Sequence, residues 1–143
     1  MDDIRDYIFK RIIHQKFSAT VVAESAGVLS GVSFAKKKAR EIGINFEFLK
    51  EEGSDFASGE ILLKLTGDPK QIALAEETII GSLAKYSGIA SSARKAVNAA
   101  GLAFRIVAGS WKKMPPEVKS GIRQAVVSGG ASFRISKTPM IYL

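Results

Sequence analysis

The sequence predicts a small α+β unit followed by the opening of a parallel α/β sheet. Up to residue 86, helix and strand patterns follow the order helix, strand, helix, strand, strand, helix. After Gly101 the order becomes strand, helix, strand, which is how a parallel sheet begins. The last residues, 140–143, form an apolar run typical of a buried strand. A parallel sheet that stops there has an unpaired apolar edge, so we expect the sheet to continue beyond this chain.

The composition excludes several kinds of protein. With 143 residues, the chain suits one domain, or one small domain plus part of another. It has no cysteine, so disulfides, thiolate chemistry and zinc–cysteine sites are excluded. No apolar run approaches the ~20 residues of a membrane helix, and no apolar signal segment follows Met1, so we expect a cytoplasmic protein. The net charge of +7 favours anionic partners.

The first elements are a helix, a strand and a second helix. Four-residue apolar spacing predicts a helix over residues 3 to 14, and alternation predicts a strand from Phe17 to Glu24. The inward residues of that strand are Phe17, Ala19, Val21 and Ala23. Gly27 and Gly31 bracket a turn, and Gly43 ends the helix that follows. The buried stripe of that helix is Val28, Val32, Ala35, Ala39 and Ile42.

Two surface features of this region suggest chemistry but have simpler interpretations. His14, the only histidine, is expected at a helix end because no serine motif or carboxylate accompanies it. The basic run 36–40 is expected to be a solvated helix face, since no aromatic residues interleave with its lysines. We therefore do not expect a nucleic-acid partner.

Two further strands and a loop follow. Ile44, Phe46 and Phe48 alternate in one strand, and Ile61, Leu63 and Leu65 alternate in the next. The intervening segment 51–60 is expected to be a loop. Its two glycines suit turns rather than a phosphate cradle, because no P-loop lysine–serine pair follows them.

The stretch 68–101 is predicted to form two consecutive helices. Asp68 can cap the first, Pro69 fits its first turn, and Gln71 completes a capping-box pattern. Ser87-Gly88 is expected to interrupt the helix, with Ser87 capping a second helix that stops at Gly101. We take this junction as the boundary between a first domain, 1–86, and the start of a second, 87–143.

Basic residues gather around the late elements. Apolar spacing predicts a strand at 104–107, a helix at 118–126 and strand-like segments at 132–135 and 140–143. Ligands bind at loops that follow parallel strands, and cations there suit carboxylates or phosphates. The candidate binding residues are Arg105, Trp111, Lys112, Lys113 and Arg134. Trp111 has two interpretations, a stacking face or a core residue.

Two further features belong to the same region. Pro115-Pro116 is expected to begin a helix, and Gly129-Gly130 to end it. No nucleophile–base pair and no His/Asp/Glu metal group is evident in the sequence, so no catalytic residue or metal ligand is assigned.

Several motifs carry a family resemblance, most specifically the junction Tyr86-Ser87-Gly88-Ile89-Ala90-Ser91. The others are the segments 26–31, 53–67, 110–115 and 129–134, together with Glu76. With these motifs the sequence resembles the type II phosphoribosyltransferases, above all the quinolinate phosphoribosyltransferases (nicotinate-nucleotide pyrophosphorylases, carboxylating). The likeness covers nearly the whole chain.

The resemblance implies an α+β sandwich domain followed by the beginning of an α/β barrel, incomplete in this chain. It implies transfer of phosphoribose from phosphoribosyl pyrophosphate to a pyridine carboxylic acid in NAD biosynthesis, with Mg²⁺ and with active sites shared across a homodimer. Lys112 and Arg134 would then contact the carboxylates of the acid. The acidic ligands for ribose and Mg²⁺ would lie on later strands, so these residues alone are expected not to catalyse the transfer.

The sequence departs from the family at three binding positions. Glu77 stands where the family has an arginine, Trp111 where it has another, and Phe133 where it has a histidine. A buried dicarboxylate needs paired cations, so these departures argue against quinolinate itself. A relative acting on another acid, such as the monocarboxylate nicotinate, and a catalytically silent binding or dimer-forming relative are the alternatives.

Overall fold

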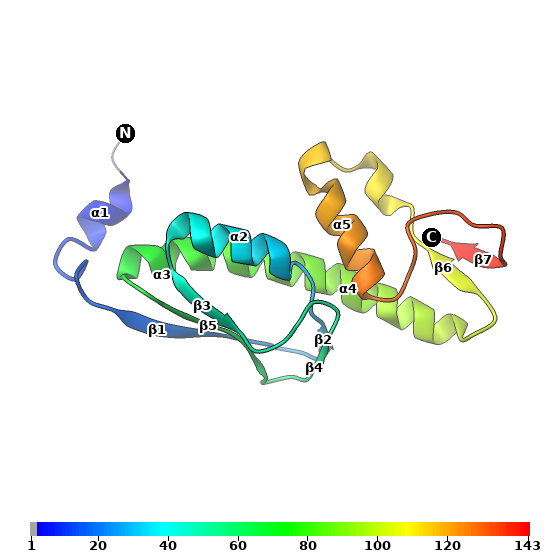
Figure 1. The fold of residues 1–143 in the computed structure, drawn as a ribbon, viewed down its shortest axis with the longest axis horizontal. Coiled ribbons are helices and arrows are strands. Elements are labelled where there is room, and N and C mark those ends of the chain that lie inside the picture. The colour runs from blue at the N-terminus through cyan, green and yellow to red at the C-terminus, as the bar shows by residue number, and fades with distance from the viewer. Residues whose placement is uncertain (1–2) are drawn as a thin grey trace.

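A computed structural model describes residues 3–143, which form two units joined along one long helix, α4 (Gly81–Ala100) (Figure 1). The first unit has a three-stranded antiparallel sheet in the order β1-β5-β3. Its strands are β1 (Phe17–Val22), β5 (Ile61–Gly67) and β3 (Asn45–Phe48). One face of the sheet is covered by α2 (Val32–Ile42), α3 (Pro69–Ala75) and the first part of α4.

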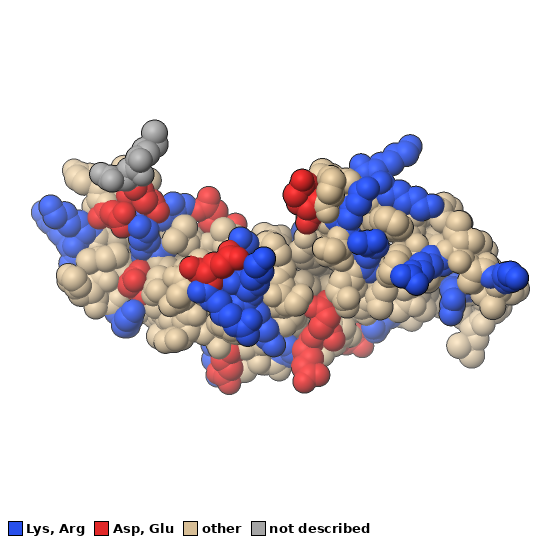
Figure 2. Space-filling model, turned by 45° about the horizontal axis from the view of Figure 1, so that its top comes forward, with Lys and Arg blue, Asp and Glu red and all other residues tan. Residues whose placement is uncertain are grey.

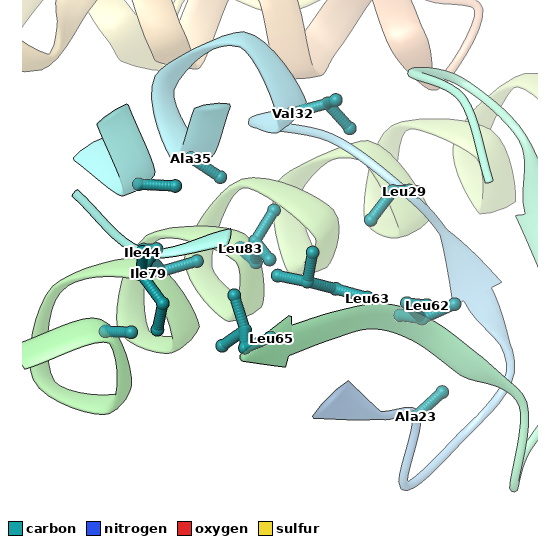
Figure 3. Close-up of a cluster of buried hydrophobic side chains, with 12 residues drawn as sticks. Ala23, Leu29, Val32, Ala35, Ile44, Leu62, Leu63, Leu65, Ile79 and Leu83 are labelled. Carbon is teal, nitrogen blue, oxygen red and sulfur yellow. The ribbon is translucent and has the colours of Figure 1, made fainter. Parts of the chain in front are cut away.

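The main core lies between this sheet and its helices. Leu63 and Leu65 of β5 point toward Ile79 and Leu83 on the helical layer (Figure 3). The expected alternation in β5 is wrong at its start, because Ile61 is 40% exposed and Leu62 is buried. The register shifts between Val21 and Val22, and this irregularity leaves Leu62 as an extra residue facing the core.

The N-terminal elements differ from expectation in three ways. The first helix, α1, spans only Ile4–Ile8, so His14 lies in the turns beyond it and not at a helix end. Two short strands, β2 (Gly27–Val28) and β4 (Asp55–Phe56), pair with one another and were not expected. Val28 therefore belongs to a strand, and α2 begins only after Gly31, whose φ of 92° favours glycine.

The predicted break at Ser87-Gly88 is wrong. The capping box of Asp68 and Gln71 is confirmed, but the helix continues from α3 through a π-helical turn, η1 (Glu76–Ile80), into α4. Ser87 is buried within α4, and its hydroxyl accepts a hydrogen bond from the backbone N–H of Ser30 at 3.1 Å. Tertiary contacts therefore outweigh the low helix propensity of serine and glycine. The expected helix end at Gly101 is confirmed.

The second unit packs on the other part of α4. It contains β6 (Arg105–Val107), the 3-10 turn η2 (Ser110–Lys113), α5 (Pro116–Ser128) and β7 (Met140–Tyr142). β6 and β7 are parallel, as expected. The strand expected at 132–135 is reduced to a single bridge from Ser132 to β6, because the Ser132 hydroxyl bonds the backbone of Arg134 and bends the chain.

The surface near β7 is apolar. Ile135, Ile141 and Leu143 are 63%, 39% and 60% exposed, so the expected apolar edge is present. Among residues 3–143, the structure has no helix that is both long and apolar enough to span a membrane.

Polar side chains fix α5 against the first unit. Arg94 of α4 binds Asp55 of β4 at 2.7 Å and donates to the backbone carbonyls of Ser128 and Gly129 at the end of α5. A cation at the carboxyl end of a helix also interacts favourably with the helix dipole. This joint sets the position of α5, which carries part of the candidate site.

Candidate functional site

The candidate site is a group of aromatic and cationic side chains beyond the carboxyl end of β6. Trp111 in η2 meets Phe133, which precedes β7, with ring centroids 6.0 Å apart and planes at 87°. Such an edge-to-face pair is a favourable aromatic geometry. We call the group formed around this pair the aromatic–cation cluster: Trp111, Lys112, Arg123, Phe133, Arg134 and Tyr142.

Packing beneath the cluster positions its two rings. Trp111 packs against a buried group that includes Tyr86 and Ile122, whereas Phe133 packs against one that includes Ile106 and Val126. The close approach of α5 to α4 depends on Gly129, where a Cβ would lie 2.3 Å from the carbonyl oxygen of Ala90. The expected helix start at the two prolines and the expected helix end at Gly129 are both confirmed.

The cations of the cluster lie over its rings. The Arg123 Cζ atom is 5.1 Å from the Trp111 ring centroid and 5.7 Å from that of Phe133. Arg134 lies over Phe133 at 5.3 Å, and the Lys112 ammonium lies over Tyr142 at 5.4 Å. Within residues 3–143 these three side chains make no salt bridge and no hydrogen bond. Aromatic faces hold the cations and leave their N–H donors for an anion.

The cluster lies in a strongly basic part of the molecule. From residue 85 to the end, the sequence has ten lysines and arginines and one acidic residue, Glu117. In Figure 2 the C-terminal end is accordingly blue, whereas blue and red alternate over the N-terminal unit. An anionic ligand approaching the cluster therefore meets a positive potential.

Of the five predicted site residues, Trp111 and Arg134 both contact Phe133, and Lys112, which follows Trp111 in η2, lies over Tyr142. Trp111, Lys112 and Arg134 are members of the cluster, and Lys113 is exposed beside them. Arg105 lies at the amino end of β6, where its backbone N–H donates to the carbonyl oxygen of Pro139, whereas the cluster lies beyond the carboxyl end of that strand. Its role in binding stays a prediction.

Sequence reasoning missed Arg123. Its neighbour Ile122 was correctly assigned to the buried stripe of the helix, and this placed Arg123 on the flank of that stripe. This position beside the buried stripe was the only indication in the sequence that Arg123 could reach a neighbouring segment. The rings that Arg123 contacts belong to η2 and to the loop before β7, and only the fold places these segments beside α5.

Glu77, the third departure from the family pattern, lies elsewhere. It belongs to η1 in the first unit, where its carboxylate bonds the guanidinium of Arg5 in α1. Within one chain, Glu77 therefore adds no negative charge to the cluster.

A separate cleft of about 1020 Å³ lies between α2 and α5 and is visible as the hollow in Figure 2. Its walls carry Lys36, Lys37 and Lys50, but also Glu51, Glu52 and Glu117, so its charge selects neither anions nor cations. The cations of α2 cover aromatic rings, with Lys36 over Phe48 and Arg40 over Phe46. The aromatic–cation cluster is thus the better candidate for anion binding.

The described residues hold no suitable set of ligands for Mg²⁺. No group of three His, Asp or Glu side chains within residues 3–143 is close enough to hold a metal ion. The expectation that magnesium ligands lie on later strands stays a prediction.

Comparison with known proteins identifies the family. A family model described as quinolinate phosphoribosyl transferase, N-terminal domain, matches residues 6–87. The chain is 33% identical over 129 residues to a probable nicotinate-nucleotide pyrophosphorylase (carboxylating) of Methanothermobacter thermautotrophicus, covering 86% of this chain and 46% of the relative. Its identity to the same-named protein of Archaeoglobus fulgidus is 28% over 127 residues, covering 87% and 49%.

A solved structure shows the same fold. The nicotinate-nucleotide pyrophosphorylase of Ehrlichia chaffeensis superimposes with a TM-score of 0.79 at 20% identity, over 92% of this chain and 48% of that one. The chain therefore belongs to the quinolinate phosphoribosyl transferase family, whose N-terminal domain it contains. It spans about half the length of the curated relatives it matches. The predicted fold class, an α+β sandwich domain followed by the beginning of an α/β barrel, is confirmed.

Proposed function

We propose that this protein acts as a phosphoribosyltransferase of NAD biosynthesis, transferring phosphoribose from phosphoribosyl pyrophosphate to a pyridine carboxylic acid. The observation that carries the proposal is the placement of Lys112 and Arg134 in one cluster beyond the end of a parallel strand. Membership of the quinolinate phosphoribosyl transferase family supports it. Loops at the carboxyl ends of such strands are where ligands bind in barrels.

In this proposal the residues of the chain bind and orient the acid. Lys112 and Arg134 supply unpaired cations for its carboxylate, and the rings of the cluster exclude water from one side. The chain supplies no nucleophile–base pair, so its contribution is positioning and charge stabilisation. Mg²⁺ would neutralise the pyrophosphate that leaves, with ligands outside this chain, so no step through the metal is derived.

A monocarboxylate such as nicotinate is the favoured alternative to quinolinate. Trp111 and Phe133 occupy two positions where the family has cationic or ionisable side chains, and both are packed as apolar rings. Fewer cations suit an acid with fewer carboxylates. A catalytically silent relative, which binds ligand or dimerises without turnover, is the competing class.

The proposal also includes homodimer formation and a cytoplasmic location.

The test begins with the mass of the protein produced from its native reading frame. That protein is then assayed with phosphoribosyl pyrophosphate, Mg²⁺ and either quinolinate or nicotinate, following the mononucleotide product. Lys112→Ala and Arg134→Ala are each expected to reduce kcat/KM by roughly 100-fold, a common cost of losing one charge-stabilising group. Lys137→Ala, an exposed lysine in the same loop as Arg134, is the matched control and should leave activity unchanged. Absence of product with both acids contradicts the enzyme and favours the silent relative.

A further inference from the structure

Arg123 is held in place without an anionic partner. Its guanidinium lies over both rings of the aromatic pair, at 5.1 Å from Trp111 and 5.7 Å from Phe133. The side chain is only half-buried, and within residues 3–143 it makes neither a salt bridge nor a hydrogen bond. Contact with ring faces uses the flat surface of a guanidinium and leaves the N–H donors around its edge. Those donors match the two oxygens of a carboxylate.

The position of Arg123 is independent of the residues that the family resemblance singled out. Those residues lie in η2 and in the loop before β7, whereas Arg123 comes from the middle of α5. The joint between Arg94 and the end of α5 fixes that helix on α4. The guanidinium is therefore presented by a rigid element, which suits a binding group whose geometry must be maintained.

The two rings restrict what else can bind there. Trp111 and Phe133 stand at 87° to one another, so apolar ring surface lies directly beside the cations of the cluster. Ring faces carry negative partial charge and attract cations, so they disfavour an anion. The indole N–H of Trp111 is buried and has no acceptor among the described residues, so it gives a second carboxylate no accessible donor.

We infer that Arg123 binds the carboxylate of an aromatic monocarboxylic acid, and that Trp111 and Phe133 exclude an acid with a second, adjacent carboxylate. Arg123 thus joins Lys112 and Arg134 in holding that one carboxylate, while the rings of Trp111 and Phe133 disfavour a second carboxylate beside it. The inference deepens the proposed function and rests on it for the pyridine ring of the acid.

Trp111, the only tryptophan in the chain, reports binding directly. The 143-residue chain is titrated with nicotinate, nicotinamide and quinolinate while Trp111 emission is followed. Nicotinate is expected to quench the emission saturably, and at least 10-fold tighter than quinolinate. Nicotinamide, which has the same ring without the charge, is expected to bind at least 10-fold more weakly. Equal affinity for nicotinamide, or tighter binding of quinolinate, overturns the inference.

Variants separate a binding role from a structural one. Arg123→Gln is expected to weaken nicotinate binding 10- to 100-fold while the far-UV spectrum stays unchanged, and Arg123→Lys to restore part of the affinity. Lys137→Gln, which removes the same charge from an exposed position, is the control and should change affinity less than twofold. Unchanged binding in Arg123→Gln overturns the inference.

A gain of binding provides a second readout if Arg123→Gln fails to fold. The pair Trp111→Arg with Phe133→His restores the family side chains and is expected to raise quinolinate affinity at least 10-fold, measured by calorimetry because Trp111 is lost. If a folded double variant gains no quinolinate affinity, the two rings do not exclude the second carboxylate.

Failure of the proposed function gives a different result: nicotinate binds through Arg123, but the native protein transfers no phosphoribose. If the native protein transfers phosphoribose to an acid that Arg123→Gln binds equally well, the proposed function holds and the inference about Arg123 is wrong.

Discussion

The carboxylate of Glu52 accepts a hydrogen bond from the hydroxyl of Ser128 at 2.8 Å, joining the loop before β4 to the last turn of α5. The same carboxylate accepts the backbone N–H of Val32 at 2.9 Å and of Gly31 at 3.2 Å at the start of α2. One side chain thus caps a helix in the first unit and anchors a helix in the second. Such charge-assisted contacts are stronger than neutral hydrogen bonds.

Replacing Glu52 should therefore destabilise both units together. Glu52→Ala is expected to lower the free energy of unfolding by about 2–4 kcal/mol, because a helix cap and several half-buried donors lose their acceptor. Urea unfolding measures the change. Glu51→Ala is the matched control, since Glu51 is exposed and its side chain makes no hydrogen bond with residues 3–143, and its effect should stay within about 0.5 kcal/mol. Equal midpoints for the two variants would show that Glu52 has no such role.

Gly129 should not tolerate even one added carbon. Its φ of −76° suits any residue, so the obstacle is space, with a Cβ falling 2.3 Å from the Ala90 carbonyl oxygen. Gly129→Ala is expected to cost about 1–3 kcal/mol by forcing α4 and α5 apart. Gly88→Ala is the control within α4, where a Cβ meets nothing within 4 Å, and it should stabilise by about 0.5–1 kcal/mol. Thermal unfolding of both variants checks the opposite signs. Destabilisation by Gly88→Ala would instead point to a hinge at the Ser87-Gly88 junction.

Acid should loosen α1 before the rest of the protein. The pKa of the Asp3 carboxyl lies below its ordinary value of 3.8, mainly because the backbone N–H of Arg5 donates to it, with Arg5 and Lys70 adding positive charge. A carboxyl with a depressed pKa stabilises the folded state above that ordinary value, and the contribution is lost as the pH falls through the lower, folded pKa. Hydrogen exchange of the α1 amides should therefore accelerate below pH 3.8. In Asp3→Ala, which removes the acceptor for the Arg5 N–H, the α1 amides should exchange faster than in the unchanged protein already above pH 3.8, and the acceleration below that pH should disappear.

The apolar surface around β7 should make the 143-residue chain self-associate. Ile135 and Leu143 are 63% and 60% exposed, and exposed apolar side chains next to an open strand edge favour pairing between chains. Light scattering is expected to show an apparent mass that rises with concentration. Ile135→Lys combined with Leu143→Lys should reduce this rise, whereas Leu102→Lys, at a fully exposed position before β6, should leave it unchanged. A monodisperse monomer at high concentration would contradict the prediction.

The sequence by itself determined the features that depend on neighbouring residues. Asp68 and Gln71 predicted a helix start, and Gly43 and Gly101 predicted helix ends, because caps are hydrogen bonds or backbone conformations set within a few residues. The order of the longer elements, β1, α2, β3, β5, β6 and α5, followed from apolar periodicity, and the motifs around Tyr86–Ser91 indicated the family that the comparisons identify.

Only the tertiary structure decided the features that join distant segments. Ser87 and Gly88 suggest a break by themselves, yet α4 continues, because the Ser87 hydroxyl bonds the backbone of Ser30 and both units pack on the same helix. The strands β2 and β4 are too short to show alternation, and they form because they pair with each other. Arg123 likewise has no motif of its own. Its place beside Trp111 and Phe133 arises because Gly129 lets α5 approach α4 closely, a contact between segments that no local pattern encodes.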